Sequence, residues 1–410
     1  MHIGIDVGSI SVKFGLVALP SDPPLPEGTR SAFLGADPVT LSGGARAYLL
    51  SYDRLMGDPN RKVPERLAEW SDRIGAGRIR DVTVTGKSGA HLAKALGFRY
   101  ENDFRCLVRG VTALHDDVRT IFEMGGENAK VIRLERSGGE GPLRIRDYDT
   151  NGDCAAGTGS FIDQQAHRMK LVVEEIGEMV ARAGSAARIA GRCSVFAKSD
   201  MIHAQQKGYS PEEILKGLCD AVARNFKSSI NKGKDPVPRV ALVGGLFANQ
   251  GVVRAICDSF GFSPEDVVLP WGYAHLGAVG AAMLSAEVRT PEERQRGQAF
   301  FLSPGLPAEG ERSFPSWPPL STGNVVFLRD RVGEVPSLEG RPELFLGIDV
   351  GSVSTNFALL DGEGNLLKEI YVSTQGRPVQ VVTEGLRDLR EEFGERIRIR
   401  GVGTTGSGRE

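Results

Sequence analysis

The sequence predicts an α/β fold, and three observations support this prediction. Short apolar segments typical of buried strands alternate with longer amphipathic segments typical of helices. Three of the predicted strands lead into glycine-containing turns, which allow backbone amides to approach a ligand closely. The opening segment of the chain also recurs near its end, which indicates a duplicated structural unit.

The composition is typical of a soluble globular protein. The chain has 410 residues, of which 40% are hydrophobic and 25% charged, and its net charge of −2 gives no electrostatic reason to expect nucleic acid or a membrane as a partner. No apolar run reaches the roughly 18 to 20 residues of a transmembrane helix, and residues 1–6 lack the features of a signal peptide. We therefore expect a cytoplasmic protein. Its five cysteines are an odd and sparse set, which argues against a disulfide framework. They form no Cys-x-x-Cys pair, which argues against a zinc ribbon or ferredoxin-type cluster within one short segment.

The repeat defines the expected domains. Residues 4–17 recur as residues 347–360 with nine of fourteen positions identical, and residues 84–89 are echoed by residues 404–409. The second copy has no counterpart of the segments from Phe122 onward, as expected of a truncated chain or gene fragment. We expect a complete domain at residues 1–288, a linker with eight prolines at 289–343, and the start of a second repeat at 344–410. With one hairpin and no second lobe, this last segment should bury little core of its own.

Local patterns predict individual elements. Strands are predicted at residues 2–7, 12–18, 82–84, 130–134 and 240–243. The clearest helix runs from Pro211 to Phe226, because Ser210 and Glu213 can form a capping box and Pro211 suits the first turn. Cys219 borders the apolar stripe of this helix, so we expect it to serve in packing.

Three segments carry a nucleotide-binding pattern. In the first, Asp6 ends a strand before a turn of small residues, where an acid can hold hydrated Mg²⁺ and backbone amides can approach phosphate. In the second, residues 123–130 place two glycines between Glu123 and Glu127, either of which could orient the attacking water or hold Mg²⁺ through water. In the third, residues 243–249 lead from a strand through two glycines, where a nucleoside can lie against bare backbone. Each segment alone is also compatible with an ordinary hairpin or strand-to-helix connection.

Together, in this order, the segments resemble the phosphate-1, phosphate-2 and adenosine motifs of the actin/Hsp70/sugar-kinase (ASKHA, ribonuclease H-like) superfamily. This resemblance implies a two-lobed α/β nucleotide-binding fold that takes ATP or ADP with Mg²⁺. The absence of a Walker motif and of a well-placed Gly-x-Gly-x-x-Gly disfavours P-loop and Rossmann folds. We predict catalytic roles for Asp6, Glu123 and Glu127. The predicted nucleotide-binding residues are Gly8, Ser9, Ser11, Lys13, Gly125, Gly126, Gly244, Gly245 and Asn249.

Two cysteines stand in distinctive surroundings. Cys154 opens the segment Cys-Ala-Ala-Gly-Thr-Gly, and Cys193, 39 residues later, opens Cys-Ser-Val-Phe-Ala-Lys-Ser-Asp. Each precedes a predicted helix, whose N-terminus favours the thiolate that binds metal. The neighbouring glycines leave room for a bulky inorganic cluster and supply N–H donors to its sulfides. The alternative is that both cysteines are buried small hydrophobic residues.

These segments resemble the BadF/BadG/BcrA/BcrD ATPase family, which includes the activators of 2-hydroxyacyl-CoA dehydratases and the ATPase subunits of benzoyl-CoA reductase. The tandem copies resemble the large multidomain activases of that group. The resemblance implies an ATP-hydrolysing electron-transfer activator in which Cys154 and Cys193 of two domains ligate one shared [4Fe–4S] cluster. The implied partners are a second copy in a homodimer or a second repeat, a low-potential donor such as ferredoxin or flavodoxin, and a dehydratase or reductase that receives the electron.

One departure and two other functions stay open. The family usually has Gly-Gly-Gln-Asp where this chain has Gly-Gly-Glu127-Asn128, which leaves open the roles of these positions in hydrolysis. A sugar or N-acetylglucosamine kinase has the same fold and would use an acid as base on a substrate hydroxyl, without needing Cys154 or Cys193. A non-catalytic scaffold would bind ATP without turnover.

Overall fold

The structure is a computed structural model that describes residues 1–35, 37–138, 141–151, 157–191, 194–287, 317–326, 340, 342–351 and 353–406. The chain divides into two compact units, Met1–Phe161 with Val222–Glu311, and Ile162–Ala221 with Arg312–Glu410. Among the described residues, no helix is long and apolar enough to span a membrane.

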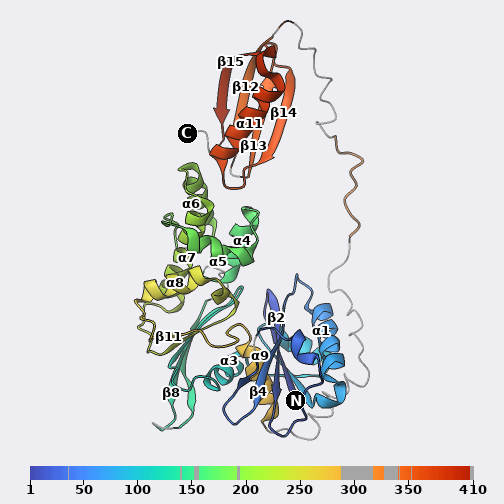
Figure 1. Ribbon diagram of the computed structural model, residues 1–410, viewed down its shortest axis with the longest axis vertical. Helices are drawn as coiled ribbons and strands as arrows, with labels where there is room; N and C mark the ends of the chain where they lie inside the picture. Colours follow the sequence, from blue (N-terminus) through green and yellow to red (C-terminus); the bar gives the residue numbers. More distant parts are fainter. Residues whose placement is uncertain are drawn as a thin grey trace. The chain divides into compact units, whose positions relative to one another are not determined.

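The first unit contains two mixed sheets (Figure 1). The strands of the first sheet lie in the order β3-β4-β2-β1-β5-β6, where β1 is His2–Val7, β2 Ser11–Ala18, β3 Val39–Thr40, β4 Arg46–Arg54, β5 Asp81–Thr85 and β6 Arg99–Tyr100. Strand β1 pairs antiparallel with β2 and parallel with β5. One face packs on α1 (Pro59–Ile74) and α2 (Gly89–Leu96), and the resulting core includes Ile3, Ile5, Phe14, Leu67 and Leu92. The strands predicted at residues 2–7, 12–18 and 82–84 are therefore confirmed.

The second sheet of this unit has the order β11-β10-β7-β8-β9. Its strands are β7 (Thr120–Met124), β8 (Ala129–Arg136), β9 (Leu143–Thr150), β10 (Val240–Val243) and β11 (Val267–Val268). On one side it packs on α3 (Asp103–Thr112) through Leu107, Val108 and Val111. The Phe122 ring also packs against Phe226 and against Phe260 of α8 (Gln250–Phe260), with ring centroids 4.9 and 5.0 Å apart. This sheet confirms the strands predicted at residues 130–134 and 240–243.

Helix α9 (Leu276–Ala286) connects the two sheets through contacts between bare backbones. It lies on the first sheet and beside α3 (Figure 1). A Cβ atom added to Gly4 of β1 would lie 1.8 Å from the Ala278 carbonyl oxygen, and one added to Gly280 would lie 1.7 Å from the Cys106 carbonyl oxygen. Gly110 of α3 is equally close, since its Cβ would lie 2.2 Å from the Leu276 oxygen. No side chain fits at these positions without displacing the backbone.

Helices and a third sheet make up the second unit. Its helices are most of α4 (Gly159–Arg168), α5 (Ile176–Arg182), α6 (Ser194–Gln206) and most of α7 (Pro211–Asn225), which continues into a π-helical turn at Phe226–Ile230. Ser210 and Glu213 form the predicted capping box, in which each backbone N–H donates to the other side chain (2.9 and 3.2 Å). Cys219 is 1% exposed, which confirms its role in packing.

The 3₁₀ helices of the described residues, in both units, are Thr29–Ala32, Ala76–Arg78, Val173–Glu175, Gly245–Ala248 and Gly394–Arg396.

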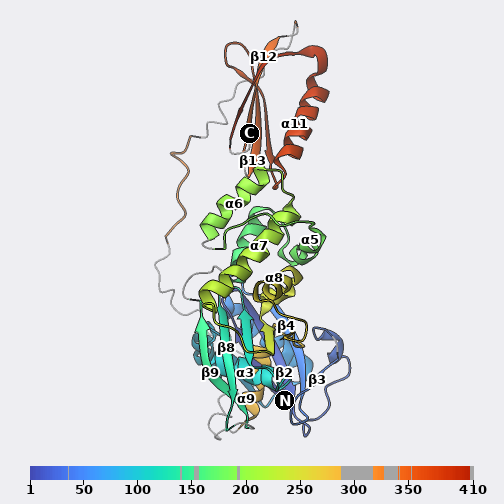
Figure 2. The same ribbon diagram turned by 90° about the vertical axis from the view of Figure 1, so that its left-hand side faces the viewer.

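The third sheet repeats the architecture of the first. Its strands, in the order β14-β13-β12-β15, are β12 (Glu343–Val350), β13 (Ser354–Leu360), β14 (Leu366–Ser373) and β15 (Arg398–Thr405), and this order matches β4-β2-β1-β5. Helix α11 (Pro378–Phe393) corresponds to α1 and covers one face of the sheet (Figure 2). The expectation that this segment buries little core was wrong. It assumed a single hairpin, whereas four strands and α11 enclose Leu344, Ile348, Phe357, Leu389 and Phe393.

We predict that Gly280→Ala destabilises the protein strongly. The new methyl group would overlap the Cys106 carbonyl, so α9 and α3 must separate, and we expect the free energy of unfolding to fall by about 3 kcal/mol or more. Denaturant unfolding followed by circular dichroism measures the change. Gly362→Ala is the matched control, because a Cβ there meets no atom within 4 Å. Equal stability of the two variants would contradict the close contact.

Candidate functional site

The turn between β1 and β2 carries the first predicted motif. Gly8 donates its backbone N–H to the Ser11 carbonyl (3.0 Å) and closes the turn. Asp6 lies opposite Lys13 in the β1–β2 register, with the Lys13 Nζ 3.9 Å from the Asp6 Oδ2. The turn therefore presents a carboxylate suited to a hydrated cation beside an ammonium group suited to phosphate.

Two glycines shape the surroundings of Asp6. Gly86 follows β5 with a φ of +92°, and a Cβ there would lie 2.6 Å from the Asp6 Oδ1. Gly277 of α9 approaches from another side, where a Cβ would lie 3.1 Å from the Asp6 Oδ2. Because neither position carries a side chain, the Asp6 carboxylate has room between them. Gly277 was not among the predicted site residues; its signal in the sequence is only a small residue at the start of a glycine- and alanine-rich helix.

The loop between β7 and β8 brings the second motif to the same place. Gly125 donates its N–H to the Asn128 carbonyl (2.7 Å), and a Cβ on Gly126 would lie 2.4 Å from a side-chain carbon of Ile10 in the β1–β2 turn. The two turns consequently line one pocket. Of the predicted residues, the pocket lining includes Asp6, Gly8, Ser9, Ser11, Lys13, Glu123, Gly125, Gly126 and Glu127.

Lys130 on β8 is a site residue that the sequence analysis missed. Its Nζ lies 2.9 Å from the Glu123 Oε2 and 2.9 Å from the Asp103 Oδ2. Burial of the ammonium group lowers the pKa of Lys130, but these two carboxylates more than offset the effect, so its pKa lies above the ordinary lysine value. Lys130 therefore stays charged and joins α3 to β7 at the wall of the pocket. Its signal in the sequence was its hairpin position, directly opposite Glu123 in the β7–β8 register.

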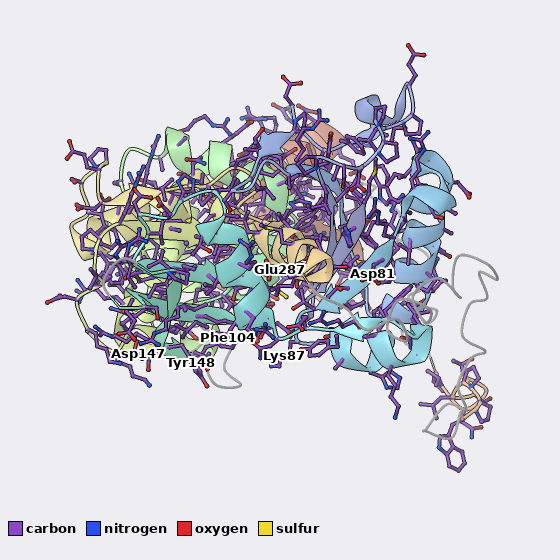
Figure 3. All side chains as sticks on the ribbon, turned by 90° about the horizontal axis from the view of Figure 1, so that it is seen from below. Asp81, Lys87, Phe104, Asp147, Tyr148 and Glu287 are labelled. Atoms are coloured by element: carbon purple, nitrogen blue, oxygen red, sulfur yellow. The ribbon has the colours of Figure 1, made fainter. Side chains whose placement is uncertain are left out.

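An aromatic ring contacts the Lys130 ammonium group. The Lys130 Nζ lies 5.0 Å from the centroid of the Phe104 ring. Phe104 packs in turn on Tyr148 of β9, with ring centroids 4.6 Å apart, and both are seen at the lower edge of Figure 3. Lys87, on the same side in that view, lines the pocket and donates to the Asn128 side chain at 3.4 Å.

The third predicted motif lies beside the pocket but does not line it. Gly244 has a φ of +103°, and a Cβ there would lie 2.4 Å from the carbonyl oxygen of Met124, just before the Gly125–Gly126 loop. A Cβ on Gly245 would lie 3.0 Å from the Tyr52 hydroxyl. Asn249 caps α8, because its Oδ1 accepts from the Gly251 N–H (2.9 Å). These residues shape the strand-to-helix connection next to the phosphate motifs.

Described residues on both sides of Cys154 are hydrogen-bonded to the β7–β8 loop. On one side, the Asn151 side chain accepts from the Ala129 N–H (2.8 Å) and donates to the Glu127 carbonyl (2.7 Å). On the other, the first amides of α4 donate to the same loop, Gly159 to Gly125 (2.8 Å) and Ser160 to Gly126 (2.6 Å). The β7–β8 loop is thus hydrogen-bonded to Asn151 on one side and to the start of α4 on the other.

The two predicted metal ligands, Cys154 and Cys193, lie outside the described residues. Helix α6 begins at Ser194, the residue after Cys193, and α4 begins five residues after Cys154. Within the part of the chain that the structure describes, no group of three or more His, Cys, Asp or Glu side chains could hold a metal ion.

We predict that Lys130→Met lowers the free energy of unfolding by about 1–3 kcal/mol, because it leaves two partly buried carboxylates without their cation. Lys130→Arg should restore part of the loss. Lys368→Met, which breaks an exposed pair with Glu392, is the control and should cost about 1 kcal/mol or less. Denaturant unfolding measures all three variants. A Lys130→Met variant no less stable than Lys368→Met would show that the ion pairs of Lys130 contribute little to stability.

The chain is similar to proteins of known role. A relative from Anaerotignum propionicum, described as "Activator of lactoyl-CoA dehydratase", is 34% identical over 55% of this chain and 83% of its own length. The "2-hydroxyisocaproyl-CoA dehydratase activator" of Clostridioides difficile is 30% identical over 53% of this chain and 77% of its own length. A benzoyl-CoA reductase component of Thauera aromatica is 26% identical over 50% of this chain and 71% of its own length.

Solved structures share the fold. Component A of the (R)-2-hydroxyglutaryl-CoA dehydratase of Acidaminococcus fermentans covers 69% of this chain and 96% of its own, with a TM-score of 0.55 and 22% identity. The ADPNP-bound activator of the 2-hydroxyisocaproyl-CoA dehydratase from Clostridium difficile covers 73% and 97%, with a TM-score of 0.53 and 25% identity. The predicted actin/Hsp70/sugar-kinase type of fold is thereby confirmed. The family model for the BadF/BadG/BcrA/BcrD ATPase family matches residues 3–285, and the chain belongs to this family of ATPases.

Proposed function

We propose that this chain is an ATP-dependent reductive activator, which couples ATP hydrolysis to the transfer of one low-potential electron to a 2-hydroxyacyl-CoA dehydratase or a benzoyl-CoA reductase-like enzyme. The observation that carries the proposal is that residues on both sides of Cys154, namely Asn151, Gly159 and Ser160, are hydrogen-bonded to the β7–β8 loop. The relatives described as dehydratase activators support the choice of partner. The domain scheme belongs to the same proposal: an ATPase domain at residues 1–288, a linker at 289–343 and a second repeat from 344.

Different pocket residues are suited to different roles in ATP hydrolysis. Asp6 is suited to hold Mg²⁺ through water, and Lys13 with the Gly8 and Gly125–Gly126 backbones is suited to hold phosphates. Glu123 pairs with Lys130 and lines the pocket from β7, and we assign it the role of orienting the attacking water. Glu127 is exposed at the tip of the loop, where it could take the same role once nucleotide has closed the pocket. Gly244, Gly245 and Asn249 remain assigned to the nucleoside.

The cysteine chemistry fits a [4Fe–4S] cluster shared by two copies. A cubane cluster needs about four thiolates, and residues 344–410 contain no cysteine. Cys106 is a poor donor, because burial raises its pKa to about 12, and Cys219 is buried in α7. Cys257 is half-buried on α8, and burial raises its pKa. Cys154 and Cys193 remain, and each precedes a helix N-terminus that favours the thiolate. Two further cysteines, from a second copy or from a second repeat, complete the set, so we expect a homodimer or a pairing of repeats.

When bound, such a cluster would accept one electron from a donor such as ferredoxin or flavodoxin and release one electron to the partner enzyme. The chain's own residues control this transfer through the β7–β8 loop. Nucleotide on Gly125 and Gly126 shifts the carbonyls that hold Gly159 and Ser160, while Glu127 shifts the Asn151 anchor. Through these bonds the state of the nucleotide would reach the residues on both sides of Cys154, and a shift of a cluster ligand would change the hydrogen bonding and exposure that tune reduction potential.

We predict that Cys154→Ser combined with Cys193→Ser abolishes iron binding but preserves nucleotide affinity. Protein purified without oxygen should contain four irons per two chains, absorb near ~400 nm and hydrolyse ATP. Cys257→Ser is the control, because Cys257 is half-buried on α8 and burial raises its pKa. Iron content, absorbance and ATPase activity are measured on the same samples.

Two results would refute the cluster assignment: wild-type protein without iron, or a double variant that keeps it. Phosphorylation of a sugar by the wild type would instead favour the kinase function, and nucleotide binding without turnover would favour a scaffold.

We further predict that Asn151→Ala uncouples Cys154 from the nucleotide. In iron-free wild-type protein, the rate of Cys154 alkylation, followed by mass spectrometry, should differ between ADP and a non-hydrolysable ATP analogue. The variant loses two hydrogen bonds to the loop, so this difference should largely disappear while nucleotide binding persists. The exposed Asn60→Ala on α1 is the control and should behave as the wild type. A variant that retains the full difference would show that Asn151 does not carry the coupling.

A further inference from the structure

The two repeats share one backbone, which allows their surfaces to be compared position by position. Strands β1 and β2 of repeat one (residues 1–86) correspond to β12 and β13 of repeat two (residues 343–406). Gly4 pairs with Gly15 in the first hairpin, and Gly347 pairs with Ala358 in the second. The turns also agree, because Gly86 and Gly406 have φ values of +92° and +90° and lie equally close to Asp6 and Asp349.

In repeat one, α9 covers the sheet face opposite α1. Its backbone at Ala278 and Ala282 contacts Gly4, where a Cβ would lie 1.8 and 2.6 Å from backbone atoms of these residues. Val17, on the same face, is 1% exposed and packs in a cluster with Val279 and Ala282. This face is therefore built to receive a helix of small residues at the closest possible distance.

In repeat two, no helix of the described residues covers the same face. We call it the open face and define it by Phe345, Gly347, Ala358, Leu360 and Tyr371. Phe345 is 39% and Tyr371 66% exposed, and the atom nearest to a Cβ on Gly347 is the Ala358 oxygen, 3.8 Å away. Helix α11 covers the other face, and among the described residues no helix covers this one (Figure 2).

We propose that the open face is a docking site for a second glycine- and alanine-rich helix of the same kind as α9. Helix α9 itself is already buried against β1, β2 and α3, so the occupant must be a different segment. The match with repeat one supports this occupant over a larger apolar surface, because Gly347 keeps the bare backbone contact. Ala358 replaces Gly15, where a Cβ would lie 3.1 Å from the Val279 nitrogen, so the docked helix must shift by only a few tenths of an ångström. This inference does not depend on the proposed function.

The polar contacts of α9 make the prediction more specific. In repeat one, the Ser285 hydroxyl bonds with His2 (3.1 Å) and donates to Asp81 (2.7 Å), which lies beside α9 in Figure 3. In repeat two, Phe345 stands in place of His2 and Gly401 in place of Asp81. A serine at the equivalent position would lose both partners and be buried unsatisfied. The occupant should therefore carry an apolar small residue where α9 carries Ser285.

The test uses the full chain and two synthetic peptides that copy residues 272–287, one with the natural sequence and one with Ser285→Ala, each with added lysines for solubility. Binding is followed by the methyl NMR signals of Ala358 and Leu360. We expect both signals to shift with the Ser285→Ala peptide, which should bind about tenfold more tightly than the natural sequence, equivalent to about 1.4 kcal/mol.

The control is Gly347→Leu in the full chain. The open space at Gly347 predicts that this variant folds as the wild type but no longer binds the peptide. Three results would overturn the proposal: no shift with either peptide, binding that persists in Gly347→Leu, or concentration-dependent shifts without peptide. The last result would show that a second copy of the chain occupies the face.

Discussion

The contact of bare backbones among β1, α3 and α9 is the constraint on which the site depends. Because Gly4, Gly110 and Gly280 carry no side chain, α9 lies directly on β1 and α3 lies directly on α9. This packing fixes how far the end of β1, with Asp6, stands from α3, with Asp103. Close packing of this kind cannot deform gradually, so the two halves of the pocket either meet in this geometry or separate.

The pocket lining carries four carboxylates and three lysines before any ligand binds. Lys130 pairs with both Asp103 and Glu123 at close range, whereas Lys13 stands 3.9 Å from Asp6, beyond hydrogen-bond distance. The two lysines are therefore not equivalent. Lys130 forms two close ion pairs at the wall of the pocket. Lys13 can rotate towards a phosphate without breaking an ion pair of that kind.

Local signals in the sequence predicted the elements well, and long-range contacts were beyond them. Strands at residues 2–7 and 240–243 match the structure because each is a short apolar run ended by glycine. The hairpin pattern could have placed Lys130 opposite Glu123. The contacts of Lys130 with Asp103 and of Gly277 with Asp6 join residues that are distant in sequence, so no local pattern could reveal them. The core of the second repeat was missed for a related reason. The core formed by its helix, Pro378–Phe393, could not be predicted before the sheet that the helix covers was known.

The differences between the two repeats distinguish the residues that the shape of the turn requires from those that phosphate binding requires. Gly351 donates to Ser354 in repeat two as Gly8 does to Ser11 in repeat one, so the turn keeps its shape. Asn356, however, takes the position of Lys13 and approaches Asp349 as a neutral amide at 3.4 Å. Without an ammonium group, that turn has lost the charge that balances a phosphate. The shape of the turn depends on the glycines and does not depend on the lysine. The presence of both in repeat one therefore favours repeat one as the place where this chain handles nucleotide.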